Sequence, residues 1–203
     1  MERSCRSGHE ERRPVKVAFH FVNSVNPCYD WFMQIVYIDS DYTDFLFKAD
    51  NRVSKNINKS YQRPYIGVLF KIEDKKYFAP LTSTKKGQKL SLNPVPENAT
   101  FFPIDDCKLG GVNINNMIPV VDSAYWLADL DISPEDAQWL VRKKIMLRKT
   151  IRFLRKHEER LILKAKFLYN KSCEGKLSEK QSRIVCDFKR LEEAAKTYNM
   201  KPR

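Results

Sequence analysis

Two β-type runs joined by a tight turn constrain this chain more than any other feature. The runs cover residues 65–72 and 75–81, and the polar turn Glu73-Asp74-Lys75 joins them. Apolar and aromatic residues bounded by turn residues in this way predict a β-hairpin. The second run ends in hydroxyl and ammonium groups, namely Thr82, Ser83, Lys85 and Lys86.

Groups of this kind suit a phosphate. Hydroxyls donate hydrogen bonds to phosphate oxygens, and a lysine or arginine balances negative charge as it builds there. A loop that follows a rigid strand is also a common place for functional residues. A solvated hairpin exit has the same composition, so the spacing by itself leaves both interpretations open.

Composition limits the class of protein. With 203 residues, 42% hydrophobic and 31% charged, the chain has the size and balance of one globular domain. No apolar run approaches the roughly 18–20 residues that span a bilayer, and residues 1–6 mix acidic and basic groups without an apolar signal core. The five cysteines are scattered and form no C-x-x-C pair. We therefore expect a cytoplasmic protein without a membrane segment, disulfide framework or zinc site.

The positive charge is concentrated in the C-terminal third. Residues 134–203 hold twenty Lys or Arg against nine Asp or Glu, whereas residues 33–133 hold twelve of each. A basic block of this size on a folded element predicts a polyanionic partner, although a solvated lysine-rich helix is the alternative. The expected RNA-binding side chains are Lys86, Arg142, Lys143, Lys149, Arg152 and Lys156.

This basic third is predicted to be helical. Ser133 is expected to cap a helix with Pro134 in its first position. One apolar stripe then runs along a long helix, or two in line, until the segment 172–175 interrupts it. Ser178 is expected to cap a last helix. The stripe consists of Leu140, Leu147, Ile151, Leu154, Leu161 and Leu168, and the last helix has Ile184, Phe188, Leu191, Ala195 and Tyr198 on its apolar face.

The middle of the chain is predicted to be rich in strands. Besides the hairpin, residues 34–38 and 117–121 read as strands, and a short helix is expected to begin around Asp39 to Tyr42. Residues 93–98 contain two prolines and are expected to form a loop. The predicted fold is therefore α+β, a compact, twisted antiparallel sheet packed with long C-terminal helices.

Residues with metal or acid–base chemistry are few. Of the three histidines, His9 and His20 fall near the start, and His157 is expected on an exposed helix surface. The acidic groups around Asp39, Glu73 and Asp105 are interpreted as structural rather than as metal ligands, with Glu73 in a hairpin turn and Asp105 in an acidic loop. The expectation is a site without metal or cofactor, built from hydroxyls and cations.

Three motifs resemble one known family when they are taken in order. They are Tyr61-x-Arg63-Pro64-x-Ile66-Gly67, then Tyr77-x-Ala79-Pro80-Leu81-Thr82-Ser83-x-Lys85-Lys86, then residues 109–120, LGGVNINNMIPV. The chain resembles the ToxN/AbiQ family of endoribonuclease toxins from type III toxin–antitoxin systems. The likeness runs from about Met33 to the C-terminus and is densest between Arg63 and Val121.

The resemblance implies a half-barrel sheet and a metal-independent, sequence-specific endoribonuclease. It implies attack by the RNA 2′-hydroxyl, which leaves 2′,3′-cyclic phosphate and 5′-hydroxyl ends, and a role in phage defence. It implies inhibition by a small folded antitoxin RNA, which the toxin also processes, in a closed toxin–RNA complex. Cellular or phage RNA would be the substrate. Carried over onto this sequence, the catalytic residues are Ser83, Thr82, Lys85, Arg63 and Tyr61, with the role of Tyr61 left between base stacking and proton transfer.

The family pattern also suggests a domain boundary. Residues 33–203 are expected to form one toxin domain, with a sheet-rich catalytic part at 33–133 and a basic helical part at 134–203. Residues 1–32 are expected to be a dispensable leader, unless Val15 to Val22 add a strand. The alternative function, from a different class, is a non-catalytic RNA- or DNA-binding regulator that uses the basic helices.

Overall fold

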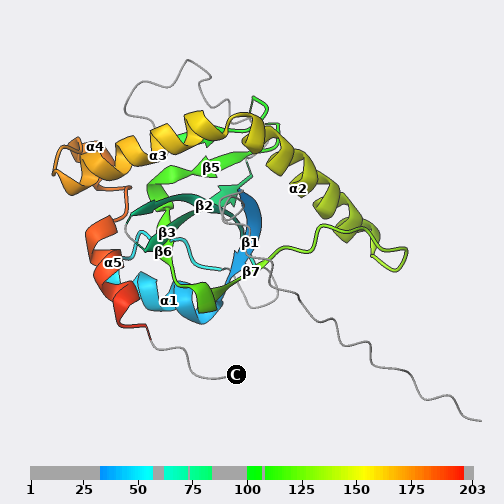
Figure 1. Cartoon of the computed structure of the whole chain (residues 1–203), viewed down its shortest axis with the longest axis horizontal. Helices are drawn as coiled ribbons and strands as arrows, with labels where there is room; N and C mark the ends of the chain where they lie inside the picture. The colour runs from blue at the N-terminus through cyan, green and yellow to red at the C-terminus, as the bar shows by residue number, and fades with distance from the viewer. Residues whose placement is uncertain (1–32, 57–61, 73, 84–99, 107, 199–203) are drawn as a thin grey trace, which may run out of the picture. The chain divides into compact units, whose positions relative to one another are not determined.

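The computed structural model describes residues 33–56, 62–72, 74–83, 100–106 and 108–198, and Figure 1 shows their arrangement. Seven strands form one antiparallel, unclosed sheet in the order β4-β5-β3-β2-β1-β7, with β6 paired to β3. The strands are β1 (Gln34–Ile38), β2 (Pro64–Ile72), β3 (Lys75–Thr82), β4 (Phe101–Pro103), β5 (Gly111–Asn113), β6 (Ile118–Val120) and β7 (Tyr125–Leu127). The predicted leader at 1–32 and the predicted loop at 93–98 lie outside the described residues.

The predicted hairpin is confirmed. Strands β2 and β3 pair with Ile72 opposite Lys75, so a two-residue turn joins them. Their register shifts between Ile66 and Phe70, which marks an irregularity in the middle of the pair. The described side chains of both strands are largely buried, which explains why apolar runs bounded by turn residues identified them.

Strand β3 has two different partners along its other edge. Lys76 to Phe78 pair with β6, whereas Leu81 and Thr82 pair with β5. The short helix η1 (Ile114–Asn116) connects β5 to β6. As a result, the exit of β3 is flanked by the β4–β5 hairpin rather than by open solvent.

Helices cover the sheet and share its hydrophobic core. They are α1 (Ser40–Ala49), α2 (Gln138–Lys156), α3 (Glu158–Cys173), α4 (Glu179–Ser182) and α5 (Phe188–Lys196), with η2 (Asp122–Ala124) between β6 and β7. Helix α3 packs on β2, and α5 packs on β6 and on α1. Among the described residues, no helix is both long and apolar enough to cross a bilayer.

The predicted apolar stripe of the long helices is confirmed from Leu147 onward, whereas Leu140 is only half-buried and lies outside the core. Leu147, Ile151 and Leu154 of α2 and Leu161 and Leu168 of α3 are all buried in the core. The two helices are separate, because the backbone at His157 leaves the helical conformation. His157 is exposed, as predicted, but it lies at the junction between the two helices rather than within one. Its ring is 4.4 Å from that of Phe153.

The predicted start of α2 is wrong. The helix begins at Gln138, and Ala137 precedes it without a side-chain cap. Ser133 and Asp136 instead close a turn, in which Asp136 Oδ2 accepts the backbone N–H of Ser133 at 2.9 Å. Asp136 also pairs with Lys144 of α2 at 3.0 Å, and this ion pair holds residues 129–136 against the helix. The turn closed by Asp136 thus takes the place of the helix start that the local capping signal predicted.

The prediction of one last helix from Ser178 is also wrong. Ser178 does form a capping box with Gln181, but α4 ends at Ser182. Asp187 caps a second helix, α5, and the Asp187 side chain accepts the backbone N–H of Arg190 at 3.1 Å. Ile184 lies between the two helices and is exposed. The chain turns here because Asn115 of η1 bonds the backbone of both Ile184 and Cys186.

Buried polar contacts join elements that are distant in sequence. The Glu192 carboxylate of α5 accepts the Tyr77 hydroxyl of β3 at 2.6 Å and the Tyr169 hydroxyl of α3 at 2.8 Å. Burial and these bonds to a carboxylate raise the pKa of both tyrosines. Because all three groups are satisfied, the network fixes β3 between the two helices.

Candidate active site

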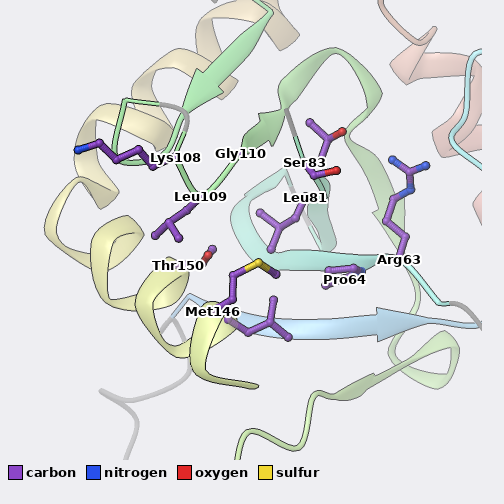
Figure 2. A pocket seen from close by; sticks show the side chains of 11 residues that line it. Arg63, Pro64, Leu81, Ser83, Lys108, Leu109, Gly110, Met146 and Thr150 are labelled. Carbon is purple, nitrogen blue, oxygen red and sulfur yellow. The ribbon is translucent and has the colours of Figure 1, made fainter. Parts of the chain in front are cut away.

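A pocket of about 310 Å³ lies where the exit of β3 meets α2. Figure 2 shows Arg63 and Ser83 on one side of it, and Lys108 and Leu109 on the opposite side. Its lining consists of Arg63, Pro64, Leu81, Thr82, Ser83, Lys108, Leu109, Gly110, Met146, Leu147 and Thr150. Three of the five side chains expected from the sequence, those of Arg63, Thr82 and Ser83, thus share one pocket.

Three of the predicted site residues belong to segments outside the described part of the chain. Tyr61, Lys85 and Lys86 lie outside the described residues, and their assigned roles stay predictions. Arg63 precedes β2, and its backbone N–H donates to the Asn56 side chain at 3.0 Å. Asn56 also donates to the carbonyl of Ile38 at 3.4 Å, so it anchors the start of β2 to the end of β1. This anchoring places Arg63 reproducibly at the pocket.

Thr82 and Ser83 are positioned by the pairing of β3 with β5. Thr82 pairs with Gly111 as the last residue of β3, and Ser83 follows it, exposed to solvent. Gly110 has a φ of +84°, and a Cβ atom built on it would lie 2.0 Å from the Thr82 carbonyl oxygen. Only glycine permits this backbone conformation and this close approach, so Gly110 determines where the Thr82–Ser83 segment lies.

Lys108 is a pocket residue that the sequence analysis missed. It belongs to the loop between β4 and β5, where Asp105 and Asp106 have φ values of +46° and +50°. Three backbone bonds between described residues close the loop. The Lys108 N–H donates to the Asp105 carbonyl at 2.9 Å, the Ile104 N–H to the Gly110 carbonyl at 3.0 Å, and the Leu109 N–H to the Ile104 carbonyl at 3.4 Å. Lys108 also lies 3.9 Å from the Asp105 carboxylate, with most of its side chain in solvent. It adds a second described cation to the pocket.

Helix α2 forms another wall of the pocket through Met146, Leu147 and Thr150. Leu147 and Thr150 are buried, whereas Met146 is exposed. Five of the six predicted RNA-binding residues lie on this helix, and Lys143 is half-buried. The four exposed ones are Arg142, Lys149, Arg152 and Lys156. The basic helix and the pocket are therefore adjacent, which the sequence did not predict.

The acidic groups considered as metal ligands have structural roles. Asp39 caps α1 by accepting the Asp41 N–H at 2.8 Å, and Asp44 pairs with Lys55 at 3.5 Å. Asp105 lies in the strained turn beside Lys108. Within the described ranges, no group of three or more His, Cys, Asp or Glu side chains has the arrangement of a metal site. Cys173 and Cys186, the cysteines that the structure describes, are free thiols.

The third motif of the sequence is mainly scaffold. Asn116 donates to the Arg52 carbonyl at 2.7 Å, and Tyr42 of α1 donates to the Pro119 carbonyl at 2.7 Å. These bonds tie η1 and β6 to α1 and to the segment that follows it. The motif therefore supports β3 from its outer edge and contributes to the pocket only through Leu109 and Gly110.

The fold and the pocket define an α+β protein with hydroxyls and cations converging at the end of an interior strand, next to a basic helix. Residues 34–196 match the family described as Toxin ToxN, type III toxin-antitoxin system. The chain belongs to this family.

Characterised relatives are similar over most of their length. The chain is 33% identical to Endoribonuclease ToxN of Bacillus thuringiensis subsp. kurstaki over 79% of this chain and 81% of the relative. It is 32% identical to Endoribonuclease ToxN of Pectobacterium atrosepticum over 79% of this chain and 91% of the relative. A solved structure from work on a processed non-coding RNA that regulates a bacterial antiviral system has 28% identity and a TM-score of 0.66, covering 83% of this chain and all of its own.

Proposed function

We propose that this chain is the toxin of a type III toxin–antitoxin system and cleaves RNA at the pocket beside β3. The observation that carries the proposal is the convergence of Arg63, Thr82 and Ser83 in that pocket, in a chain of the ToxN family. Relatives at 33% and 32% identity are named endoribonucleases, which favours an enzyme over a non-catalytic regulator.

The groups in the pocket suit a phosphodiester. The Thr82 and Ser83 hydroxyls donate hydrogen bonds to the non-bridging oxygens of the scissile phosphate, and the Arg63 guanidinium holds the same group through its planar donors. Lys85 balances the charge that builds on the phosphoryl oxygens, and Tyr61 stacks on a base or assists proton transfer. The roles of these last two residues rest on the sequence motif.

RNA supplies its own nucleophile. The 2′-oxygen forms a bond to phosphorus while the bond from phosphorus to the 5′-oxygen breaks. The 2′-hydroxyl loses a proton, the leaving 5′-oxygen gains one, and the products are a 2′,3′-cyclic phosphate and a 5′-hydroxyl. The protein contributes alignment of the attack and electrostatic stabilisation of the transition state. This step needs no metal ion, so cleavage is expected to continue in excess EDTA.

The proposed antitoxin is a small folded RNA bound at α2 and beside the pocket. Over its nineteen residues α2 holds eight Lys or Arg and no Asp or Glu. Solved relatives at 28–29% identity come from work on a regulatory non-coding RNA and on toxin inhibition by a non-coding RNA pseudoknot. We infer a closed toxin–RNA complex that the toxin itself processes, acting in the cytoplasm in defence against phage. The working domain is residues 33–203, with residues 1–32 dispensable.

The test is the purified Ser83→Ala variant on an RNA substrate. Ser83 is exposed, so loss of its hydroxyl leaves the fold intact while cleavage falls by about 100-fold, as for the loss of one transition-state donor. Ser123→Ala, at an exposed serine outside the pocket, is the matched control and is expected to cleave like the parent. Mass spectrometry of the fragments reports the cyclic phosphate and 5′-hydroxyl ends. Parental cleavage by Ser83→Ala, or 5′-phosphate products, would refute the site or the mechanism.

A further inference from the structure

Trp139 is the most exposed large apolar side chain in the described part of the protein, at 67%. It lies in the first turn of α2, and it is not part of the hydrophobic core. Exposing an indole to water forgoes the stabilisation that burying a large aromatic surface gives. Its position therefore points to a role outside folding.

Helical geometry places Trp139 in line with the pocket. Met146 and Thr150, which line the pocket, follow Trp139 by seven and eleven residues. At 3.6 residues per turn, these steps return to nearly the same face, and the Cα atoms of Trp139 and Met146 are about 10 Å apart along the axis. Met146 is itself 42% exposed, so this face of the helix carries an exposed apolar side chain at both positions.

Charges of both signs lie near Trp139: Glu135 precedes the helix and is exposed, while Asp129, Asp131 and Asp136 pair with Lys144 and Arg148 of α2. Arg142 is one turn further along the helix and exposed to solvent. The Lys143 ammonium lies 5.1 Å from the centre of the Tyr37 ring, and Lys144 turns inward to Asp129 and Asp136. The helix therefore combines an exposed indole with an exposed guanidinium beside a pocket that suits a phosphodiester. Alternating aromatic and cationic contacts of this kind bind single-stranded nucleic acid.

We propose that Trp139 stacks on a base of the substrate RNA strand while the scissile phosphate occupies the pocket. This inference rests on the proposed function and adds a positioning residue to it. The stack lies outside the reacting atoms. It fixes the path of the strand along α2, from the pocket towards the N-terminal end of the helix, and thereby helps to select unpaired RNA as the substrate.

Steady-state cleavage of two RNA substrates tests the proposal. One is an unstructured oligonucleotide that extends several nucleotides to both sides of the cleaved bond, and the other is a dinucleotide that fills only the pocket. Trp139→Ala is expected to raise KM for the long substrate by about 5- to 100-fold, the effect of losing one base–aromatic stack, with kcat unchanged. The dinucleotide is expected to show no change. Trp139→Phe keeps a stacking ring and is expected to restore most of the affinity.

A matched control and a direct signal complete the experiment. Leu163→Ala removes another exposed apolar side chain, 62% exposed on α3, and is expected to leave both substrates unaffected. A protein carrying Trp31→Phe, Trp126→Phe and Ser83→Ala retains Trp139 as its only tryptophan and does not cleave. Its fluorescence is expected to be quenched as the long oligonucleotide is added, because the base contacts the indole.

Each outcome decides the matter. If the parent cleaves and Trp139→Ala has the parental KM for the long substrate, the stacking role is wrong while the proposed function stands. The same holds if Trp139→Ala weakens only antitoxin RNA binding. It also holds if the parent sediments as a dimer that Trp139→Ala dissociates, because the indole would then contact a second copy of the chain. If the parent itself cleaves neither substrate, the proposed function fails instead.

Discussion

Replacing Gly110 by alanine should displace the Thr82–Ser83 segment while the rest of the protein stays folded. Gly110 has a φ of +84°, which costs an L-residue about 1–2 kcal/mol. The new Cβ would also lie 2.0 Å from the Thr82 carbonyl oxygen and 3.1 Å from the Ser83 Cα. These are backbone atoms, so the clash is relieved only by moving the strand exit or the β4–β5 loop.

The structure sets the size of this effect. Real Cβ contacts are essentially never shorter than 3.0 Å, so the backbone must move by about 1 Å. Overpacking of this kind costs about 1–3 kcal/mol beyond the cost of the positive φ. The smaller conformational entropy of alanine in the unfolded chain offsets about 0.4–1 kcal/mol. We expect a folded protein that is destabilised by about 1–5 kcal/mol. A misplacement of about 1 Å at the site is expected to lower kcat/KM by about 100-fold.

Gly175 provides the matched control. Its φ is +68°, but nothing lies within 4 Å of a Cβ built on it. Gly175→Ala therefore introduces the backbone strain without the clash, and it is expected to lose a little stability and no activity. Urea unfolding gives the stability of both variants, and cleavage of a short RNA gives kcat/KM. If folded Gly110→Ala cleaved as fast as Gly175→Ala, the Thr82–Ser83 segment would not be where the chemistry occurs.

Three further predictions concern charge. Asp50→Asn should destabilise the fold by about 1.5–3 kcal/mol at pH 7, because the carboxylate, only 2% exposed, accepts bonds from Arg52 and from the Asp187 N–H. Burial opposes ionisation there, but these bonds lower the pKa of Asp50, so the difference from the parent should disappear as unfolding is measured below about pH 4. Burial, followed by the charge of Arg160, lowers the pKa of Lys164 to about 8. The parent should therefore gain stability relative to Lys164→Met between pH 8 and about 10.5, and a stability difference that does not change with pH would contradict this. Replacing four exposed cations of α2 by glutamine should weaken antitoxin RNA binding, and the slope of log affinity against log salt should fall by about 0.7 per lost phosphate contact. The four are Arg142, Lys149, Arg152 and Lys156. Parental affinity at physiological salt would exclude α2 from the interface.

Long, strongly patterned elements were predictable from the sequence. Strand β1 was predicted with its observed limits, and the β2–β3 hairpin was placed to within a residue at either end. The apolar stripe from Leu147 to Leu168 was also correct, because helical periodicity over many residues needs no knowledge of the partner. The start of α1 was also predicted, because a short helix was expected to begin around Asp39 to Tyr42.

Three short strands and two helix boundaries were not predicted from the sequence. Strands β4, β5 and β7 have three residues each and were missed, whereas β6, which is equally short, was predicted within residues 117–121. The capping signal at Ser133 was strong in sequence, yet Asp136 closes a turn with Ser133 and the helix begins only at Gln138. Likewise, the backbone of Ile184 and Cys186 bonds to Asn115 and divides the last predicted helix into α4 and α5.

The sequence by itself determined which chemical groups this protein can offer, because the Thr82-Ser83 motif, Arg63 and the basic composition of α2 are properties of the chain. Only the tertiary structure decided that these groups meet. The pairing of β3 with β5 brings Lys108 and Gly110 to the exit of the strand, and the packing of α2 closes the pocket with Met146 and Thr150. The physical reason is that these neighbours are far apart along the chain and are joined by burial and strand pairing, which no local pattern encodes.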